Sequence, residues 1–135
     1  MGIEKTKRPV YNDGEASVCE TKTLSGASAA AAATLLNRGT TFIVSTGTGA
    51  GWSVNLPRPL RAGIRKTIFF DANSTVPIEV RTASSVDTFF GSTANALACT
   101  TGLVTPKRAI LIGKSTSQWA VLHLSTGVTV AGATA

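Results

Sequence analysis

The sequence predicts an all-β protein: a single-domain β-sandwich of jelly-roll or related Greek-key type with an extended N-terminal arm. Short segments of alternating apolar residues recur at near-regular spacing, and turn-forming residues separate them, as in sandwiches and barrels. The 135 residues match about one domain and can bury roughly two thirds of the unfolded surface. We therefore expect residues 1–23 to form the arm and residues 24–135 to form the sandwich.

The N-terminal segment has few apolar residues and a turn signal at its Asn-Asp-Gly sequence, residues 12–14. Its isolated apolar anchors are Ile3, Val10, Tyr11 and Val18. A segment of this kind buries little of its own surface, so we expect an arm that docks on a partner, with a disordered tail as the alternative.

Residues 24–36 are the run that most favours a helix. They contain five consecutive alanines, with Ser25 or Ser28 available as a cap and Gly39 as a stop. The run predicts a short Ala-rich helix of two to three turns, with an extended linker as the alternative.

The central feature is a strand at residues 52–56, then a basic loop, then a strand at residues 66–70. Apolar side chains alternate in the first strand at Trp52, Val54 and Leu56, which predicts one buried face. The two prolines that follow remove backbone donors and end the strand. In the second strand, Ile68 and Phe70 are expected on one face and Phe69 on the other. We expect the sandwich to be built outward from this pair.

The remaining strands follow from shorter alternating or continuous apolar runs. They are predicted at residues 40–45, 76–82, 86–90, 96–101, 108–113, 118–124 and 128–131. Glycines at alternate positions between residues 47 and 51 predict a hairpin tip that leads into the strand at residues 52–56. The clearest hairpin joins residues 108–113 to residues 118–124, where Trp119, Val121 and His123 are expected on one face.

Charge is low in amount and uneven in placement. Charged residues make up 15% of the chain, against about 25% in an average protein, which favours packing against neighbouring molecules. The formal net charge is +6; residues 1–20 carry −1 and the rest of the chain carries +7.

The strongest functional candidate is the basic loop between the central strands. It carries Arg58, Arg61, Arg65 and Lys66 and no acidic residue. Guanidinium groups pair well with carboxylates and phosphates. Because no aromatic residue is interleaved in the loop to stack on bases, protein carboxylates are favoured over nucleic acid. A solvated loop without a partner is the alternative.

Catalytic and metal-binding signals are weak. His123 is the only histidine and is expected to pack in the core or at its rim, since no acid or nucleophile is linked to it by spacing. The run Gly113-Lys114-Ser115 lacks the upstream glycine of a phosphate-binding loop. We expect no enzyme activity, no cofactor and no metal, and we expect Cys19 and Cys99 to be thiols rather than a disulfide.

The N-terminus has no apolar signal-peptide core, and the sequence contains no apolar run long enough to span a membrane. The first six residues match the bare N-myristoylation pattern, which is short enough to be matched often by chance. We therefore expect a protein made in the cytoplasm, with no membrane partner.

The order of these features resembles a known group of proteins. The segments TTFIVSTG, WSVNLPRPLRAGIRKTIFF, IEVRT followed by FFGS, and RAILIGKSTSQWAVLHL are similar to those of small β-sandwich proteins from tailed bacteriophages, the capsid cement or decoration proteins. The resemblance covers about residues 24–125 and rests on the pattern of strands and turns. It implies a non-enzymatic virion protein that binds as an oligomer across joints between subunits of the major capsid protein.

The resemblance also implies a place on the outer surface of a capsid, after synthesis in the host cytoplasm, and assembly as a homodimer or homotrimer. On charge and exposure, we expect the arm to reach over a neighbouring subunit and the basic loop to meet the coat surface. Two other functions stay open: an oligomerising or receptor-binding domain of a phage tail fibre or spike, and a nucleic-acid-binding β-barrel suggested by the basic body.

Overall fold

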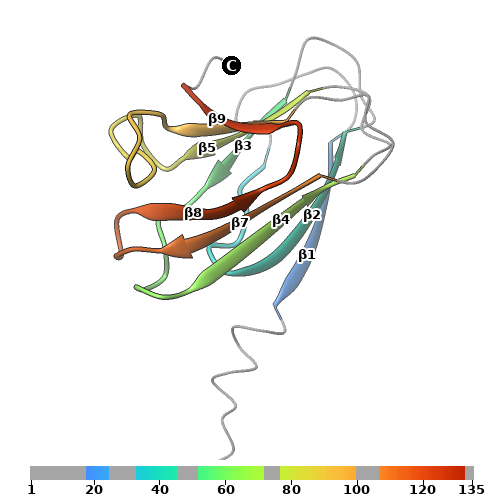
Figure 1. The fold of residues 1–135 in the computed structure, drawn as a ribbon. Coiled ribbons are helices and arrows are strands. Elements are labelled where there is room, and N and C mark those ends of the chain that lie inside the picture. Colours follow the sequence, from blue (N-terminus) through green and yellow to red (C-terminus); the bar gives the residue numbers. More distant parts are fainter. Residues whose placement is uncertain (1–17, 25–32, 46–51, 72–76, 100–106, 133–135) are drawn as a thin grey trace, which may run out of the picture.

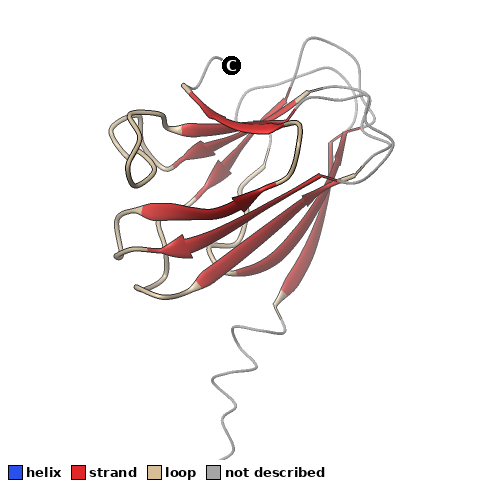
Figure 2. Cartoon of the chain, viewed as in Figure 1, coloured by secondary structure: helices blue, strands red, loops and turns tan. Residues whose placement is uncertain are grey.

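Two β-sheets lie face to face (Figure 1). The computed structural model describes residues 18–24, 33–45, 52–71, 77–99 and 107–132. These residues form nine strands and no helix (Figure 2). The predicted all-β, two-sheet architecture is confirmed.

One sheet has five strands and the other has four. The five-stranded sheet has the order β1 (Cys19–Leu24), β2 (Gly39–Ser45), β4 (Arg65–Phe70), β7 (Lys107–Gly113) and β8 (Trp119–Leu124). The four-stranded sheet has the order β3 (Trp52–Leu56), β5 (Ile78–Thr82), β6 (Ala96–Cys99) and β9 (Val128–Ala131). The sheets therefore take strands from interleaved parts of the chain.

The first half of the chain winds between the sheets as a parallel coil. β1, β2 and β4 run parallel in one sheet, and β3 and β5 run parallel in the other. Residues 33–35 pair with the edge of β3: Leu35 N donates to Asn55 O, and Asn55 N donates to Ala33 O, both at 2.8 Å. Three pairs of consecutive strands lie in one sheet: β1 and β2, β5 and β6, and β7 and β8. Between β1 and β2, residues 33–35 pair with the other sheet.

This winding differs from two expectations. A jelly roll is built from antiparallel Greek keys, whereas three of the ladders here are parallel, so the jelly-roll type is not confirmed. The predicted hairpin between β2 and β3 is wrong, because β2 belongs to the five-stranded sheet and β3 to the four-stranded sheet. The two central strands, β3 and β4, also lie in different sheets. The loop with Pro57 and Pro59 carries the chain from one sheet to the other.

Three local predictions are also corrected. A helix over all of residues 24–36 is wrong, because Leu24 ends β1 and residues 33–35 are extended; residues 25–32 lie outside the described part. The sheet begins at Cys19, within the segment assigned to the arm. The segment at residues 86–90 is a loop: Asp87 N and Phe89 N donate to Ser84 O and Ala94 O within the β5–β6 connection, and the bond from Phe90 N to Trp119 O does not continue into a ladder.

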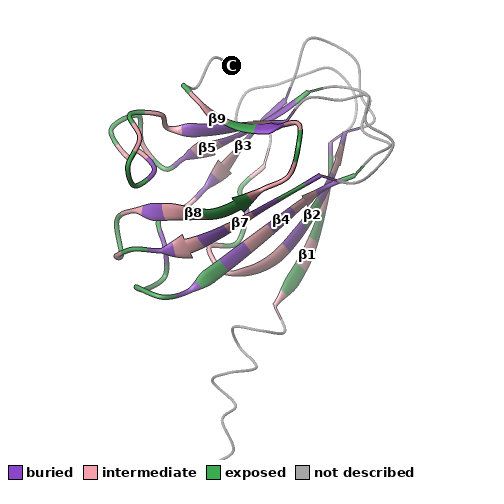
Figure 3. Cartoon of the chain, in the orientation of Figure 1, coloured by how far each residue is buried: buried purple, intermediate pink, exposed green. Residues whose placement is uncertain are grey.

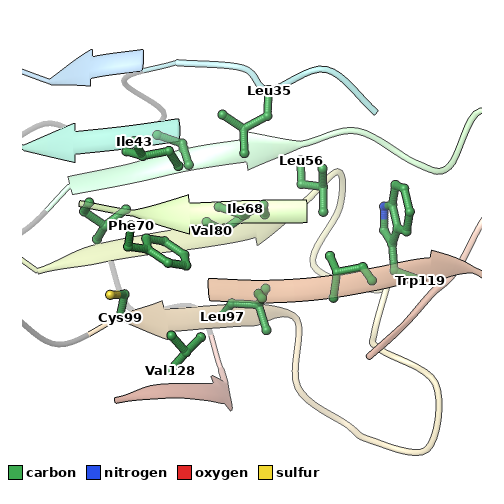
Figure 4. Close-up of a cluster of buried hydrophobic side chains, with 14 of the residues drawn as sticks. Leu35, Ile43, Leu56, Ile68, Phe70, Val80, Leu97, Cys99, Trp119 and Val128 are labelled. Atoms are coloured by element: carbon green, nitrogen blue, oxygen red, sulfur yellow. The ribbon is translucent and has the colours of Figure 1, made fainter. Parts of the chain in front are cut away.

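The core lies between the sheets (Figure 4). Buried and more exposed residues alternate along several strands, as expected for strands with one face on a core (Figure 3). The alternating residues of β3 and β4 that the sequence predicts to be buried are all buried: Trp52, Val54, Leu56, Ile68 and Phe70. Full burial of one such side chain contributes roughly 1.5–3 kcal/mol, so these positions stabilise both sheets at once.

A β-bulge in the last hairpin changes which side chains of β8 are buried. Ile110 pairs with His123 and Leu111 pairs with Val121, so Leu122 is an extra residue on β8. Val121 and Leu124 pack against the core, whereas Leu122 and His123 are exposed. The expectation that His123 lies on the face of Trp119 and packs in the core or at its rim is therefore wrong, because the bulge shifts the alternation by one residue and leaves His123 exposed.

Candidate functional site

Three loops meet at one end of the sandwich, which we call the loop end: residues 57–64, 83–95 and 114–118 (Figure 1). Backbone hydrogen bonds join the first loop to the end of β7, where the last loop begins, since Gly63 N donates to Gly113 O at 2.7 Å and Gly113 N donates to Ile64 O at 2.8 Å. Gln118 Nε2 donates to Thr88 O at 3.2 Å, which joins the loop at residues 114–118 to the loop at residues 83–95. The loops are therefore held together as one surface.

A bidentate ion pair braces the loop end. Arg58 Nε lies 2.8 Å from Asp87 Oδ2, and a terminal guanidinium nitrogen of Arg58 lies 2.9 Å from Asp87 Oδ1. The hydrogen bonds from Arg58 lower the pKa of Asp87, and those to Asp87 raise the pKa of Arg58. The pair lies in a polar depression of about 330 Å³. Arg58 was predicted to bind a partner protein, but in this structure its guanidinium group donates hydrogen bonds to both carboxylate oxygens of Asp87.

Trp119 supports this end from inside. Its side chain is buried, and Nε1 donates to the carbonyl of Pro57 at 2.9 Å. Its own carbonyl accepts a hydrogen bond from Phe90 N at 2.9 Å. One tryptophan thus ties the start of the basic loop to the loop that carries Asp87.

The three loops carry exposed apolar side chains and also exposed cationic side chains. Val86 is 78% exposed, Phe90 is 59% exposed and Leu60 is 47% exposed. The Nζ atom of Lys114 lies 5.3 Å from the centre of the Phe90 ring, within the range of a cation–π contact. Arg61 is exposed on the first loop. We call these five residues the loop-end surface.

The other two residues of the predicted basic site lie elsewhere. Arg65 is the first residue of β4 and is exposed on the outer face of the five-stranded sheet. Lys66 is fully buried, so the prediction that it binds a partner is wrong. The strand alternation explains this placement, because Lys66 shares the inward face of Ile68 and Phe70.

Lys66 instead belongs to a buried polar cluster near the start of β1 and β2. Its Nζ atom donates to Thr41 Oγ1 and to the carbonyl of Arg38 (3.3 Å), and it lies 3.6 Å from Glu20 Oε2. The same Glu20 oxygen accepts hydrogen bonds from Thr41 Oγ1 and from the backbone N–H of Leu36, both at 2.6 Å. The cluster joins β1, β2 and β4.

The cluster changes the acidity of both charged groups. Burial lowers the pKa of Lys66 to about 8, although the charge of Glu20 partly offsets that effect. For Glu20, burial acts to raise the pKa, but the hydrogen bonds from Thr41 and Leu36 and the charge of Lys66 together lower it. Lys66 and Glu20 therefore act inside the protein as a buried ion pair.

One of the four predicted arm residues can be placed. Val18 is half-buried beside β2, and its carbonyl accepts a hydrogen bond from Thr40 N at 2.9 Å. A β-carbon on Gly39 would lie 2.3 Å from that carbonyl oxygen, so this approach requires glycine, which also has φ +69° there. Ile3, Val10 and Tyr11 lie outside the described residues.

The described part of the chain contains no group of three side chains that could hold a metal ion. The prediction of two thiols is confirmed: Cys19 is exposed, Cys99 is buried, and they form no disulfide. Burial raises the pKa of the Cys99 thiol to about 11. Within the same residues, no helix is long and apolar enough to cross a membrane.

Sequence reasoning missed Val86, Asp87, Phe90 and Lys114 as parts of the site. One signal for Phe90 was present in the sequence. In an extended segment, neighbouring side chains such as Phe89 and Phe90 point to opposite faces, so only one of the two can be buried in the core. Phe89 is buried and Phe90 is exposed. The pairing of Asp87 with Arg58, 29 residues apart, had no local signal.

No protein-family model matches this sequence, and no curated protein is significantly similar to it.

Proposed function

We propose that this protein is a non-enzymatic virion protein that cements or decorates a phage capsid by binding across subunits of the major capsid protein. The observation that carries the proposal is the loop-end surface, where exposed apolar groups stand beside cations on loops held by the Arg58–Asp87 pair. A surface that is already ordered loses little conformational entropy when it binds, which suits a protein that clamps others.

The chemistry of the loop end favours a protein partner with exposed carboxylates. Its loops contain three bases, Arg58, Arg61 and Lys114, against one acid, Asp87, which is paired internally. An exposed aromatic ring beside cationic side chains is the composition found at the energetic centre of many protein interfaces. The bacteriophage resemblance of the strand and turn pattern supports the capsid as the source of that partner.

Co-sedimentation with intact particles of the phage that carries the gene tests this proposal. The chain should sediment at a fixed ratio to the major capsid protein. Phe90→Ser should weaken that binding about tenfold or more, because aromatic anchors carry a large share of interface energy. Leu122→Ser is the matched control, since Leu122 is 48% exposed on β8 in the five-stranded sheet.

Two results would count against the proposal. If the wild-type chain stays in the supernatant with intact particles, the capsid role is wrong. If Phe90→Ser and the Leu122→Ser control bind equally well while both remain folded, the capsid role stands but the loop-end surface is not its binding site.

A further inference from the structure

The outer face of the five-stranded sheet is unusually apolar for a face turned away from the core. Most side chains at its centre are bulky and apolar: Phe42, Val44, Phe69, Ile110 and Ile112. The exposed Arg108 of β7 lies on the same face, opposite Phe69. The outward positions of the four-stranded sheet hold only small or polar side chains. Strands that are apolar on both sides are typical of sheets covered on both faces, so this face has the composition of one that is covered.

Phe42 and Phe69 define the centre of this face. They lie opposite each other on β2 and β4, and their rings stack with centroids 5.1 Å apart and planes 10° apart. A depression of about 360 Å³ lies beside them, lined also by Thr21, Ile43, Val44 and Asp71. Two aromatic rings next to a carboxylate suit an arginine, whose stem packs on the rings while its guanidinium pairs with the acid.

The matching arginine is the first residue of β4. Arg65 begins β4 and Asp71 directly follows its last residue, so the two exposed side chains lie three residues on either side of Ile68. Rotation by 180° about an axis that crosses the strands at Ile68, between two facing sheets, exchanges these two positions. Each Arg65 then faces the Asp71 of the other copy.

We propose that a second copy of this chain packs on this face around that two-fold axis, with Arg65 of each copy entering the depression beside Phe42, Phe69 and Asp71 of the other. The surface is self-complementary, as a two-fold interface requires. A phosphate-bearing partner fits less well, because the Asp71 carboxylate would repel phosphate at the depression. This inference does not depend on the capsid role.

The dimensions of the face predict a weak interface. Six residues of β4 cover about 20 Å and five strands cover about 24 Å, so the contact is roughly 500 Å² on each copy. Interfaces of that size belong to reversible complexes. The dimer should therefore form in a concentration-dependent way.

Sedimentation velocity of the full chain over a concentration series tests the dimer. Arg65→Asp alone and Asp71→Arg alone should each shift the monomer–dimer midpoint at least tenfold higher, because each places like charges together twice across the axis. The double variant Arg65→Asp with Asp71→Arg restores both pairs with reversed sense and should recover the wild-type midpoint. Arg61→Asp carries the same charge change outside the face and should leave the midpoint unchanged.

A cross-linking experiment tests the geometry itself. In a Cys19→Ser background, an Arg65→Cys chain is mixed with an Asp71→Cys chain and treated with a thiol cross-linker of about 10 Å, the spacing of packed sheets. The mixture should give a cross-linked heterodimer that keeps one Arg65–Asp71 pair, and neither chain alone should cross-link efficiently. Cys99 is buried and should not react.

Several outcomes would overturn the proposal. One is a wild-type chain that stays monomeric at its highest soluble concentration. Another is a folded double variant that dimerises as weakly as the single variants. The third is a single cysteine variant that cross-links alone as efficiently as the mixture does. A monomer that binds a poly(dT) oligonucleotide at low salt through Arg65 would replace the second copy with nucleic acid.

Discussion

Lys66 is a residue whose strand alternation predicts its position correctly, whereas its charge suggested an exposed binding site. In the sequence it closes a cluster of bases, and a cluster of bases suggests an exposed binding site. In the structure its side chain is fully buried and contacts Thr41, the carbonyl of Arg38 and Glu20. The strand period places it with Ile68 and Phe70, so the period was the better guide to its position.

The buried amine predicts a specific pH dependence of stability. Lys66 has a pKa of about 8 in the folded protein, below its ordinary value of 10.5. Between those two pH values the unfolded chain binds more protons than the folded protein, so the free energy of unfolding rises with pH, by about 3 kcal/mol in total from this group.

Urea unfolding at several pH values between 7.5 and 10.5 measures this effect, with Lys66→Met as the reference. The difference between wild type and variant should grow in favour of the wild type as pH rises. Cys99 acts in the opposite direction, because its raised pKa removes stability as pH rises toward 11, but it is present in both proteins and cancels. A difference that stays constant with pH would contradict the burial of Lys66.

The two tryptophans predict a second test at the scale of single residues. Both are buried, but Trp119 Nε1 donates to Pro57 O, whereas Trp52 Nε1 has no hydrogen-bond partner among the described residues. Replacement of either by alanine should cost about 3–5 kcal/mol of unfolding free energy. Trp119→Phe should cost about 1 kcal/mol more than Trp52→Phe, because it also leaves the part-buried Pro57 carbonyl without its donor.

At the scale of elements, the sequence predicted strand positions well and strand ends less well. Alternating apolar residues located the strands that face the core, as at Trp52, Val54 and Leu56. They failed at the Leu122 bulge, where one extra residue changes the face of His123, and at residues 86–90, where apolar residues fold as a loop. No local pattern records either event, because both depend on what the neighbouring strand or loop provides.

Gly113 predicts how tightly the end of β7 is packed against the basic loop. A β-carbon at this position would lie 2.6 Å from the carbonyl oxygen of Arg61 and 2.8 Å from Cβ of Pro59. Gly113→Ala should therefore displace the loop and cost about 1–3 kcal/mol of unfolding free energy. Gly132→Ala is the control, since a β-carbon there meets nothing within 4 Å. Equal melting temperatures for the two variants would show that the loop moves aside without strain.

At the scale of the whole molecule, the sequence predicted the class of the fold but not its topology. Two packed sheets follow from many short alternating strands. The parallel coil through β1, β2, β3, β4 and β5 does not, because pairing partners are set by contacts across long stretches of chain. The candidate site was predicted only in part for the same reason. The sequence predicted Arg58 and Arg61 as site residues, but it did not predict Asp87, Phe90 and Lys114, which come from other loops.

The same topology predicts slow folding. Parallel pairing across the sheets requires long loops to close before contacts form, and proteins of this kind fold in milliseconds to seconds rather than microseconds. Stopped-flow refolding from urea, followed by tryptophan fluorescence, should show a main phase in that range. Complete refolding within the dead time would indicate that local structure dominates instead.

The winding of the chain between the sheets also has a mechanical consequence. Because most connections cross from one layer to the other, the layers are joined by covalent backbone as well as by side-chain contacts in the core. A load that pulls the two layers apart acts along the polypeptide at each crossing, so the sandwich should resist delamination under strain. No single cut in the chain separates the two layers, since β3 of the four-stranded sheet lies between β2 and β4 of the five-stranded sheet, and β9 follows β7 and β8.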